Sequence, residues 1–504
     1  PAVRGDDPKY PLSPHHPSRL AALRQKGLEQ AGFAKHPAVH WFYIDDEGTG
    51  FSETDYDKAE FKKQTGQTWP TKFNAVSDHY NVAKFHLHGG NNVWKSAFDG
   101  LREALPDRTH FFLQTVGNVA ANGGWIWDNF RDSDINCIDL YPPAPSDVGQ
   151  CCFYYNAMRC LGYRNGHPGW IMLGEYRETF EMMRGQWWLA LGSGLESHSW
   201  YGANYGGGPH GIGTDRINRI APYDRRAMRY GALLARWDKP RSKIAMYWSL
   251  ASCARRGEEE GRKAIRVHGQ AVGKACEATA LDFYRHDVYP DVLTEAEILR
   301  DEHLRYDAIV LAGVTWDTQP VVDKLTQFAR TRPLQLTQSS TISIPGAVPY
   351  APDVLAQEAL PGVRTADPAV FAEPLEAGGQ RYLIVYNHQD KRADADVLVP
   401  AGWGAVVYDV FAHRRLTATP GNEGMNCLKM PLDGFDGVLL AFFFVFDFVL
   451  TYLLAFNEWL GLDPDPRISE WLSFVLFLPV GFGLGFQLPL VMVFLDRLGI
   501  VEVK

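Results

Sequence analysis

Two glutamates stand where a chain could place the acid and base groups for glycosidic cleavage. Glu47 follows the apolar run Val39–Asp45, and Glu175 follows the apolar run Trp170–Gly174. Breaking a glycosidic bond needs two carboxyl groups, one that protonates the leaving oxygen and one that attacks the anomeric carbon or activates water. In a β/α barrel such groups lie at the carboxyl ends of strands. The positions of Glu47 and Glu175 therefore predict a catalytic pair.

A simpler interpretation is that acids at strand ends cap the helices that come after them. The chain offers other acids in comparable places, which are Asp45, Asp46, Glu53 and Glu178. One glutamate after a strand would carry little weight, whereas two of them, three strands apart, favour catalysis. The sequence leaves both interpretations open.

The composition narrows the class of partner. A formal net charge of −9 offers no basic stripe for a phosphate backbone, so we expect no nucleic-acid partner. The 15 tryptophans supply many flat apolar rings, and such rings suit the faces of sugars. Large barrels also use tryptophan for packing, so the count alone does not identify a carbohydrate site.

Metal and cofactor chemistry are not predicted. The seven cysteines are odd in number and form no C-x-x-C pair, so neither a zinc site nor a disulfide framework is indicated. His86 and His88 alternate like metal ligands, but no third ligand is evident, and we interpret this stretch as a solvated loop. We expect a protein that uses no metal and no cofactor.

Residues 1–240 alternate apolar runs with helical stretches, which is typical of a β/α barrel. The predicted strands are Val39–Asp45, His110–Val116, Ile135–Tyr141, Trp170–Gly174 and Leu195–Tyr201. The predicted helices are Ser18–Ala31, Glu53–Gln64, Val148–Leu161, Thr179–Leu191 and Tyr223–Trp237. A closed barrel has eight strands, so the sequence predicts an incomplete TIM-type barrel that lacks the first three strand-helix units. Its unpaired edges lead us to expect weak activity or none.

Two further domains are predicted after the barrel. Residues 241–340 read as an α/β unit with a parallel sheet. Its strands are predicted at Lys243–Trp248, Leu281–Val288 and Tyr306–Ala312, and its helices at Gly269–Ala280 and Pro320–Thr331. Residues 341–440 alternate short β-rich runs, such as Tyr382–Tyr386 and Ala405–Tyr408, with glycine and proline turns. This alternation predicts a β-sandwich.

Residues 441–504 are predicted to form a transmembrane helical hairpin. Leu439–Phe456 is apolar except for Asp447, and Trp471–Leu495 has no charge over more than the ~20 residues that a bilayer core requires. The acidic stretch Asn457–Glu470 between them reads as a turn. The predicted location is a membrane crossed twice, with lipid as a partner.

The charges that flank this hairpin predict its orientation. The turn holds one arginine and several acids, while Lys429, Arg497 and Lys504 lie on the other side of the two apolar stretches. The positive-inside rule then places the turn outside, and both the soluble body and the C-terminus in the cytoplasm.

The second apolar stretch also carries a specific resemblance. Ile468–Val501 resembles the fourth transmembrane region of the twin-arginine translocase subunit TatC, and Phe442–Phe456 resembles the span before it. The likeness rests on an S-E-W-L-S-F start, a glycine-spaced middle, an F-Q-L-P step and an R-L-G-I-V exit. The family usually has Glu inside the membrane where this chain has Gln487, which removes an ionisable group. Gln487 is then either structural or a contact for other membrane helices.

The order of the two glutamates resembles a large clan of retaining (β/α)8 glycoside hydrolases, in which the acid/base follows the fourth strand and the nucleophile the seventh. A barrel followed by an α/β domain and a β-sandwich resembles the family 42 β-galactosidases. Their middle domain is similar to glutamine amidotransferases, and Arg305–Trp316 (RYDAIVLAGVTW) is like its strand and turn. Gly313 and Val314 stand where an amidotransferase has its cysteine, so that chemistry is not implied.

This resemblance implies a role for each candidate residue. Glu47 would be the general acid/base and Glu175 the nucleophile, with Trp200 as a platform for the sugar. The residues that would line the cleft are His198, Trp125 and Trp127, although each of these rings could equally pack the barrel. This chain departs from the family in one respect. The family has an Asn-Glu pair at the acid/base position, whereas this chain has Asp46–Glu47. The resemblance also implies a carbohydrate substrate and a homo-oligomer.

Three functions are therefore compatible with the sequence. The first is a retaining β-galactosidase-like glycoside hydrolase, impaired by an open barrel. The second is a membrane protein of the TatC type whose hairpin docks onto other membrane helices. The third is a chimera of two unrelated parts with no single function, because the sandwich runs into the apolar segment near Leu440 without a linker.

Overall fold

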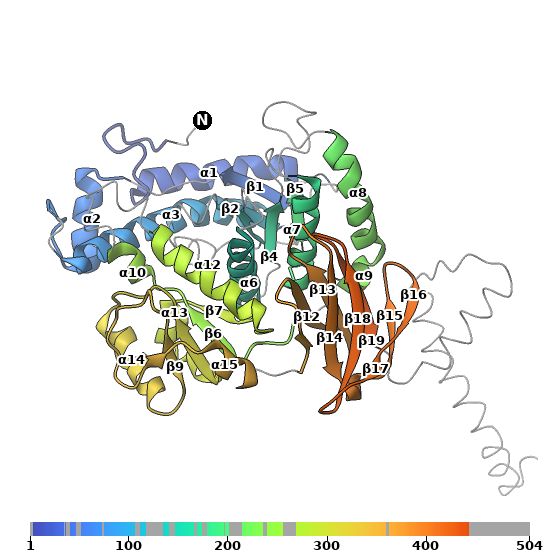
Figure 1. The fold of residues 1–504 in the computed structure, drawn as a ribbon. Coiled ribbons are helices and arrows are strands. Elements are labelled where there is room, and N and C mark those ends of the chain that lie inside the picture. The colour runs from blue at the N-terminus through green and yellow to red at the C-terminus, as the bar shows by residue number, and fades with distance from the viewer. Residues whose placement is uncertain are drawn as a thin grey trace, which may run out of the picture. The chain divides into compact units, whose positions relative to one another are not determined.

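The computed structural model describes most of the chain up to Phe442. The described residues are 4–34, 36, 41–46, 52–72, 75–105, 111–116, 135–140, 147–165, 169–173, 179–195, 197–200, 214–234, 239–255, 269–358, 362–377 and 379–442, apart from a few single positions within these ranges. Residues 1–222 and 237–442 form one compact unit, which contains the four sheets seen in Figure 1.

The first sheet has five parallel strands in chain order. They are β1 (Trp41–Asp46), β2 (Phe111–Val116), β3 (Ile135–Asp139), β4 (Gly169–Leu173) and β5 (Ser197–Trp200). All five strands lie where the apolar runs predict them, within three residues at either end. The parallel sheet expected for the β/α barrel is therefore confirmed.

The helices of this region follow the prediction less closely. They are α1 (Pro17–Ala34), α2 (Asp55–Thr65), α3 (Val76–Ala104), α6 (Val148–Asn165), α7 (Phe180–Gly192), α8 (Thr214–Arg229) and α9 (Gly231–Leu234). The helix predicted at Tyr223–Trp237 begins nine residues earlier, at Thr214. The 29-residue helix α3 is absent from the prediction.

Helix α3 packs closely along α1. A Cβ atom on Gly27 of α1 would meet the backbone of Ala97, and a Cβ atom on Gly100 of α3 would meet the backbone of Arg24. These two glycines therefore let the helix backbones approach each other. The buried side chains beside them are Ala31, Trp94, Phe98, Leu101 and Leu105. The apolar face of α3 becomes evident only against α1, which is why its sequence alone reads as a loop.

The second sheet is parallel and has the order β10-β9-β8-β6-β7. Its strands are β6 (Ile244–Tyr247), β7 (Asp291–Leu293), β8 (Ala308–Leu311), β9 (Leu334–Leu336) and β10 (Val348–Pro349). Its helices are α10 (Leu250–Arg255), α12 (Gly269–Arg285), α13 (Glu295–Leu299), η4 (Glu302–Arg305), α14 (Gln319–Ala329) and α15 (Pro352–Glu358). The predicted α/β unit is therefore present.

One predicted strand of this unit is wrong. The stretch Leu281–Val288 is expected to be extended, but its first five residues complete α12. Ala280, Phe283 and Tyr284 are fully buried, and their spacing of three and four residues is helical. The edge strand of the sheet is instead the short β7, too brief to give a periodic signal.

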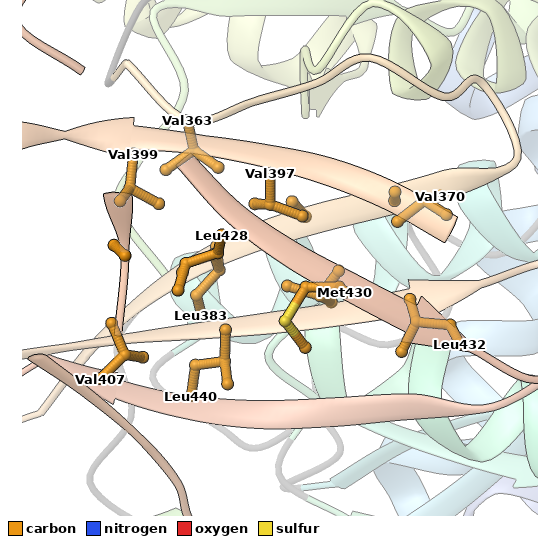
Figure 2. Packing of buried hydrophobic residues seen from close by; sticks show 14 of the residues in the cluster. Val363, Val370, Leu383, Val397, Val399, Val407, Leu428, Met430, Leu432 and Leu440 are labelled. Carbon is orange, nitrogen blue, oxygen red and sulfur yellow. The ribbon is translucent and has the colours of Figure 1, made fainter. Parts of the chain in front are cut away.

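The third region is a β-sandwich, as predicted. One sheet has the order β11-β14-β18-β17 and the other β12-β13-β19-β15-β16. The strands are β11 (Arg364–Thr365), β12 (Val370–Ala377), β13 (Gln380–Asn387), β14 (Ala393–Pro400), β15 (Val406–Asp409), β16 (Arg414–Thr417), β17 (Thr419–Pro420), β18 (Met425–Leu432) and β19 (Gly437–Phe442), with η5 (Ala401–Trp403) after β14. Figure 2 shows the aliphatic side chains of the two sheets meeting in one core.

The end of the sandwich corrects the start of the predicted membrane hairpin. Leu439 to Phe442 are predicted to begin the first apolar span, but they belong to β19, which pairs with β13 on one side and β15 on the other. All four residues are buried, so both faces of this part of β19 are apolar, and this produces the misleading hydropathy. No helix in the described part of the chain has the length and apolarity to cross a bilayer. Residues 443–504 lie outside that part.

Candidate active site

The carboxyl edge of the barrel sheet is formed by the last residues of β1 to β5. Because the five strands are parallel, these ends share one edge of the sheet. β1 ends at Asp46, directly before Glu47, and β4 ends at Leu173, two residues before Glu175. Glu47 and Glu175 lie outside the described residues, so their pairing stays a prediction about the side chains that come after two described strands.

The spacing of the strands sets a requirement for that pairing. β1 and β4 are separated by β2 and β3, and three steps of about 4.8 Å span about 14 Å along the sheet. A retaining pair has its carboxyl groups about 5–5.5 Å apart. The predicted pairing of Glu47 and Glu175 therefore requires a sheet that curves between β1 and β4 as a barrel wall does. The register of β1 against β2 shifts between Tyr43 and Asp46, an irregularity of the kind that bends a strand beside an active site.

Strand β5 carries two of the predicted cleft residues. His198 is in register with Ile171 of β4, and Trp200, the last residue of β5, is in register with Leu173. The backbone thus places Trp200 at the same carboxyl edge, beside the strand that precedes Glu175. The side chains of His198 and Trp200 are not described.

The remaining predicted residues cannot be placed. Trp125 and Trp127 fall in the connection from β2 to β3, and Gln487 falls in the C-terminal segment. All three lie outside the described residues, so their roles stay predictions.

Helix α7, the first helix after Glu175, is fixed at its start and along its length. The Thr179 hydroxyl caps it by accepting the Met182 N–H at 3.2 Å. Arg184 donates from Nε to the Phe435 carbonyl at 2.9 Å, and Trp188 donates from Nε1 to Asp436 Oδ1 at 3.0 Å. The turn before β19 in the sandwich therefore anchors α7. Residues 174–178 connect β4 to this anchored helix.

Helix α6 joins the barrel to the α/β domain. Every residue from Cys151 to Cys160 is buried, because α6 lies between the barrel sheet and α12. Gly149 approaches α12 so closely that a Cβ atom there would lie 2.7 Å from the Glu277 carbonyl oxygen. Burial raises the pKa of the Cys152 thiol well above its usual range, so this thiol is inert at neutral pH.

A buried ion pair lies where the barrel, the α/β domain and the sandwich meet. The Lys239 ammonium donates to the Glu373 carboxylate, and the two side chains are 2% and 0% exposed. Lys239 also donates to the Gly192 carbonyl at the end of α7, and Glu373 accepts from the Tyr386 hydroxyl at 3.3 Å. Burial lowers the pKa of Lys239 to about 8. Sequence reasoning missed this pair because 134 residues separate its members.

A second buried pair continues the same network. Arg159 of α6 donates to Asp291 Oδ1 of β7 at 3.2 Å, and the Asp291 carboxylate also accepts from the Tyr306 hydroxyl at 2.9 Å. Arg159 reaches Asn156 at 3.0 Å, and Asn156 donates to the Tyr284 hydroxyl at 2.9 Å. These buried groups are hydrogen-bonded into a network that holds the three domains in one arrangement.

The two histidines that alternate like metal ligands lie on α3. His86 is only 3% exposed, so the expectation of a solvated loop there is wrong. His88, one half-turn further, is exposed and contacts Gln64 Oε1 at 3.2 Å. No group of three or more metal-ligating side chains is close enough to bind a metal ion in the part of the chain that the structure describes.

The α/β domain offers a second place where a ligand could bind, but it is filled. The strand order changes direction at β6, so the carboxyl ends of β6 and β8 form a switch point. There the N–H groups of Gly313 and Val314 donate to Thr337 and Ser340, at 3.4 and 3.1 Å. Trp316 packs against Tyr80 of the barrel helix α3. The backbone donors of this turn are thus used internally.

Comparison with solved structures shows which proteins share this fold. The β-galactosidase from Bacillus circulans sp. alkalophilus is 13% identical with a TM-score of 0.63, over 85% of this chain and 83% of that chain. The β-galactosidase from Rahnella sp. R3 gives 12% and 0.60, over 85% and 82%. An exo-carrageenase of family GH42 from Bacteroides ovatus gives 14% and 0.59, over 88% and 72%. The chain shares the fold of the family 42 enzymes.

Comparison with known sequences identifies a different likeness at the C-terminus. Residues 433–504 match the family described as "Sec-independent protein translocase protein (TatC)". TatCy from Bacillus subtilis (strain 168) is 35% identical over 65 residues, and TatC from Halalkalibacterium halodurans is 37% identical over 65 residues. Each match covers 13% of this chain and 26% of the relative, so the chain spans about a quarter of the translocase proteins it matches.

Proposed function

We propose that residues 1–442 form a glycoside hydrolase-type body whose reaction is the retaining cleavage of β-linked sugars, at a rate that the open barrel weakens. One observation carries the proposal: two glutamates closely follow β1 and β4, the first and fourth strands of one parallel sheet, at its carboxyl edge. In this proposal Glu47 is the general acid/base and Glu175 the nucleophile. The fold shared with family 42 β-galactosidases supports a galactoside as the substrate.

The test is hydrolysis of an aryl β-galactoside by the full chain in detergent. Glu175→Gln removes the nucleophile and Glu47→Gln removes the acid/base, so each should lower the rate by at least about 10²-fold. Glu178→Gln, a nearby acid in the same connection, is the matched control and should leave the rate unchanged. Hydrolysis that survives Glu175→Gln would overturn the assignment.

The two roles can then be separated. Azide added to Glu175→Ala should give an α-galactosyl azide, because it replaces the enzyme nucleophile on the opposite face of the sugar. Azide added to Glu47→Ala should give a β-galactosyl azide, because it replaces water in the second step. Products of the reverse stereochemistry would exchange the two assignments.

A second function is supported by the match at residues 433–504 to TatC. In this proposal the C-terminal segment inserts in a membrane and contacts other membrane helices, with Gln487 as one contact. The full chain should then remain in the bilayer fraction after a carbonate wash. Recovery of the chain as a soluble species without detergent would argue against it.

The two likenesses also support the chimeric alternative. The sandwich completes its last strand at Phe442, and the translocase-type match begins at residue 433, within the same region. Reading the genomic DNA and the transcript across codons 436–446 distinguishes the alternatives. An uninterrupted reading frame favours a natural fusion, whereas a break there favours two separate genes.

A further inference from the structure

Three aromatic rings gather on the surface of the barrel region. The ring centroids of Tyr10 and Tyr56 are 5.7 Å apart, those of Tyr10 and His16 are 5.6 Å apart, and those of His16 and Tyr56 are 4.5 Å apart. Each ring is partly exposed to solvent. We call these three residues the ring cluster.

Its exposure distinguishes the ring cluster from the packed aromatic groups of the chain. Trp187 and Trp188 of α7 are 2% and 1% exposed, and Tyr284 and Phe371 at the sandwich are fully buried. Those rings contribute to the core. The rings of the ring cluster, by contrast, are partly exposed to solvent.

Polar groups of both kinds surround the ring cluster. Asp7 accepts the Lys9 N–H at 2.9 Å through Oδ1 and lies 3.5 Å from His16 Nε2 through Oδ2. The Lys9 ammonium lies 5.0 Å from the centroid of the Tyr10 ring, and Asp55 is exposed beside Tyr56. Rings flanked by hydrogen-bond donors and acceptors match a sugar, which presents an apolar C–H face and a rim of hydroxyls.

The rings are held in place before any ligand arrives. The Ser13 hydroxyl donates to Asp57 Oδ1 at 2.5 Å, and Asp57 also accepts from the Thr54 backbone N–H at 2.9 Å in the capping box of α2. His15 stacks on Phe85 of α3 at 3.9 Å. These contacts fix the N-terminal segment on α2 and α3. A site with little freedom to lose binds with a smaller entropic cost.

The ring cluster also has a defined relation to the candidate active site. Tyr56 is in the first turn of α2, the first helix after β1, and β1 ends at the carboxyl edge beside Glu47. Ten residues along the chain therefore separate the end of β1 at Asp46 from Tyr56.

We propose that the ring cluster is an accessory binding site for a sugar unit of an extended β-linked saccharide. The proposal deepens the glycosidase function proposed above and rests on it for the identity of the sugar. Binding at the rings needs no cleavage, so the two can fail separately.

The test is saturation-transfer NMR on the full chain, in a detergent without a sugar head group, with a β-linked galacto-oligosaccharide as the probe. The ring protons of the probe should receive saturation from the wild-type chain. Tyr56→Leu keeps the apolar volume but removes the aromatic face, so binding should weaken roughly threefold to tenfold. Tyr56→Phe keeps the face and should retain binding.

Two controls separate the possible outcomes. Tyr223→Leu changes a partly exposed tyrosine on α8 and should leave the transfer unchanged. All variants are repeated with Glu175→Gln, in which the probe stays intact, and equal thermal unfolding shows that each variant is folded. Equal transfer in Tyr56→Leu and wild type, or none in wild type, overturns the accessory site. A chain that binds through Tyr56 but shows no hydrolysis loses only the proposed catalytic function.

Discussion

The buried pair of Lys239 and Glu373 allows a sharp prediction about stability. Both side chains are almost completely removed from water, and each carries hydrogen bonds to neighbouring groups. Lys239→Met removes one charge and leaves the Glu373 carboxylate buried without its counter-ion. Breaking a buried pair in this way costs about 3–5 kcal/mol. Lys243→Met, at an exposed pair with Asp307 separated by 3.8 Å, is the matched control and should cost at most about 1 kcal/mol.

The double variant Lys239→Met with Glu373→Gln should recover most of this loss. It leaves neither position charged, and the glutamine can still accept from the Tyr386 hydroxyl. Replacing a whole buried pair is often neutral or stabilising. The measurement is urea unfolding of the full chain in detergent, followed by tryptophan fluorescence, with wild type, both single variants and the double variant compared as a cycle. A double variant as unstable as Lys239→Met would refute the reasoning.

The pH dependence of the same pair has a definite sign. The pKa of Lys239 is about 8 in the folded chain against 10.5 for an unperturbed lysine, and burial is the main cause. Between these values the unfolded chain binds one more proton than the folded chain, so folding becomes more favourable as the pH rises from 8 to 10.5. The stability difference between wild type and Lys239→Met should therefore widen over this range, and a constant difference would contradict the assignment.

Single sites give three further predictions. Burial raises the pKa of Asp317 to about 6 from 3.8, so the free energy of unfolding falls by about 3 kcal/mol as the pH rises from 3.8 to 6. Asp317→Asn should abolish this pH dependence of the unfolding free energy, measured by urea unfolding. An unchanged pH dependence would refute burial of Asp317 as its cause. Burial lowers the pKa of His15 to about 4. Wild type should therefore lose stability relative to His15→Phe as the pH falls from 6.5 to 4, as measured by thermal unfolding. An equal dependence of the unfolding temperature on pH in the two proteins would contradict this prediction. Trp188→Phe removes the hydrogen bond from Nε1 to Asp436 and should lower the free energy of unfolding by about 1 kcal/mol. If urea unfolding of this variant matches wild type, the bond does not anchor α7.

The sequence predicted the strands better than the long helices. β4 lies within one residue of its predicted ends because it is a short apolar run. Helix α3 was missed, since its polar positions and the Gly89–Gly90 pair hide a face that becomes apolar only against α1. Leu281–Val288 was misassigned as a strand, because a helix that is buried on several sides has an almost continuous apolar sequence, and such a sequence resembles a buried strand.

The candidate site was predicted only in its outline. A strand end followed by a glutamate is visible in the sequence, so Glu47 and Glu175 could be proposed from it. The anchoring of α7 by the sandwich could not, because Arg184 and Phe435 are 251 residues apart. The same holds for Lys239 and Glu373. Contacts between distant segments depend on the packing of whole domains, which local patterns do not encode.

Strand β19 makes the sandwich mechanically dependent on the segment that begins at residue 443. Phe442 pairs with Arg381 of β13 and with Val407 of β15, and the chain continues from it without a spacer. Tension applied at residue 443, for example by an inserting apolar segment, would load these end pairs first and open the strand one pair at a time.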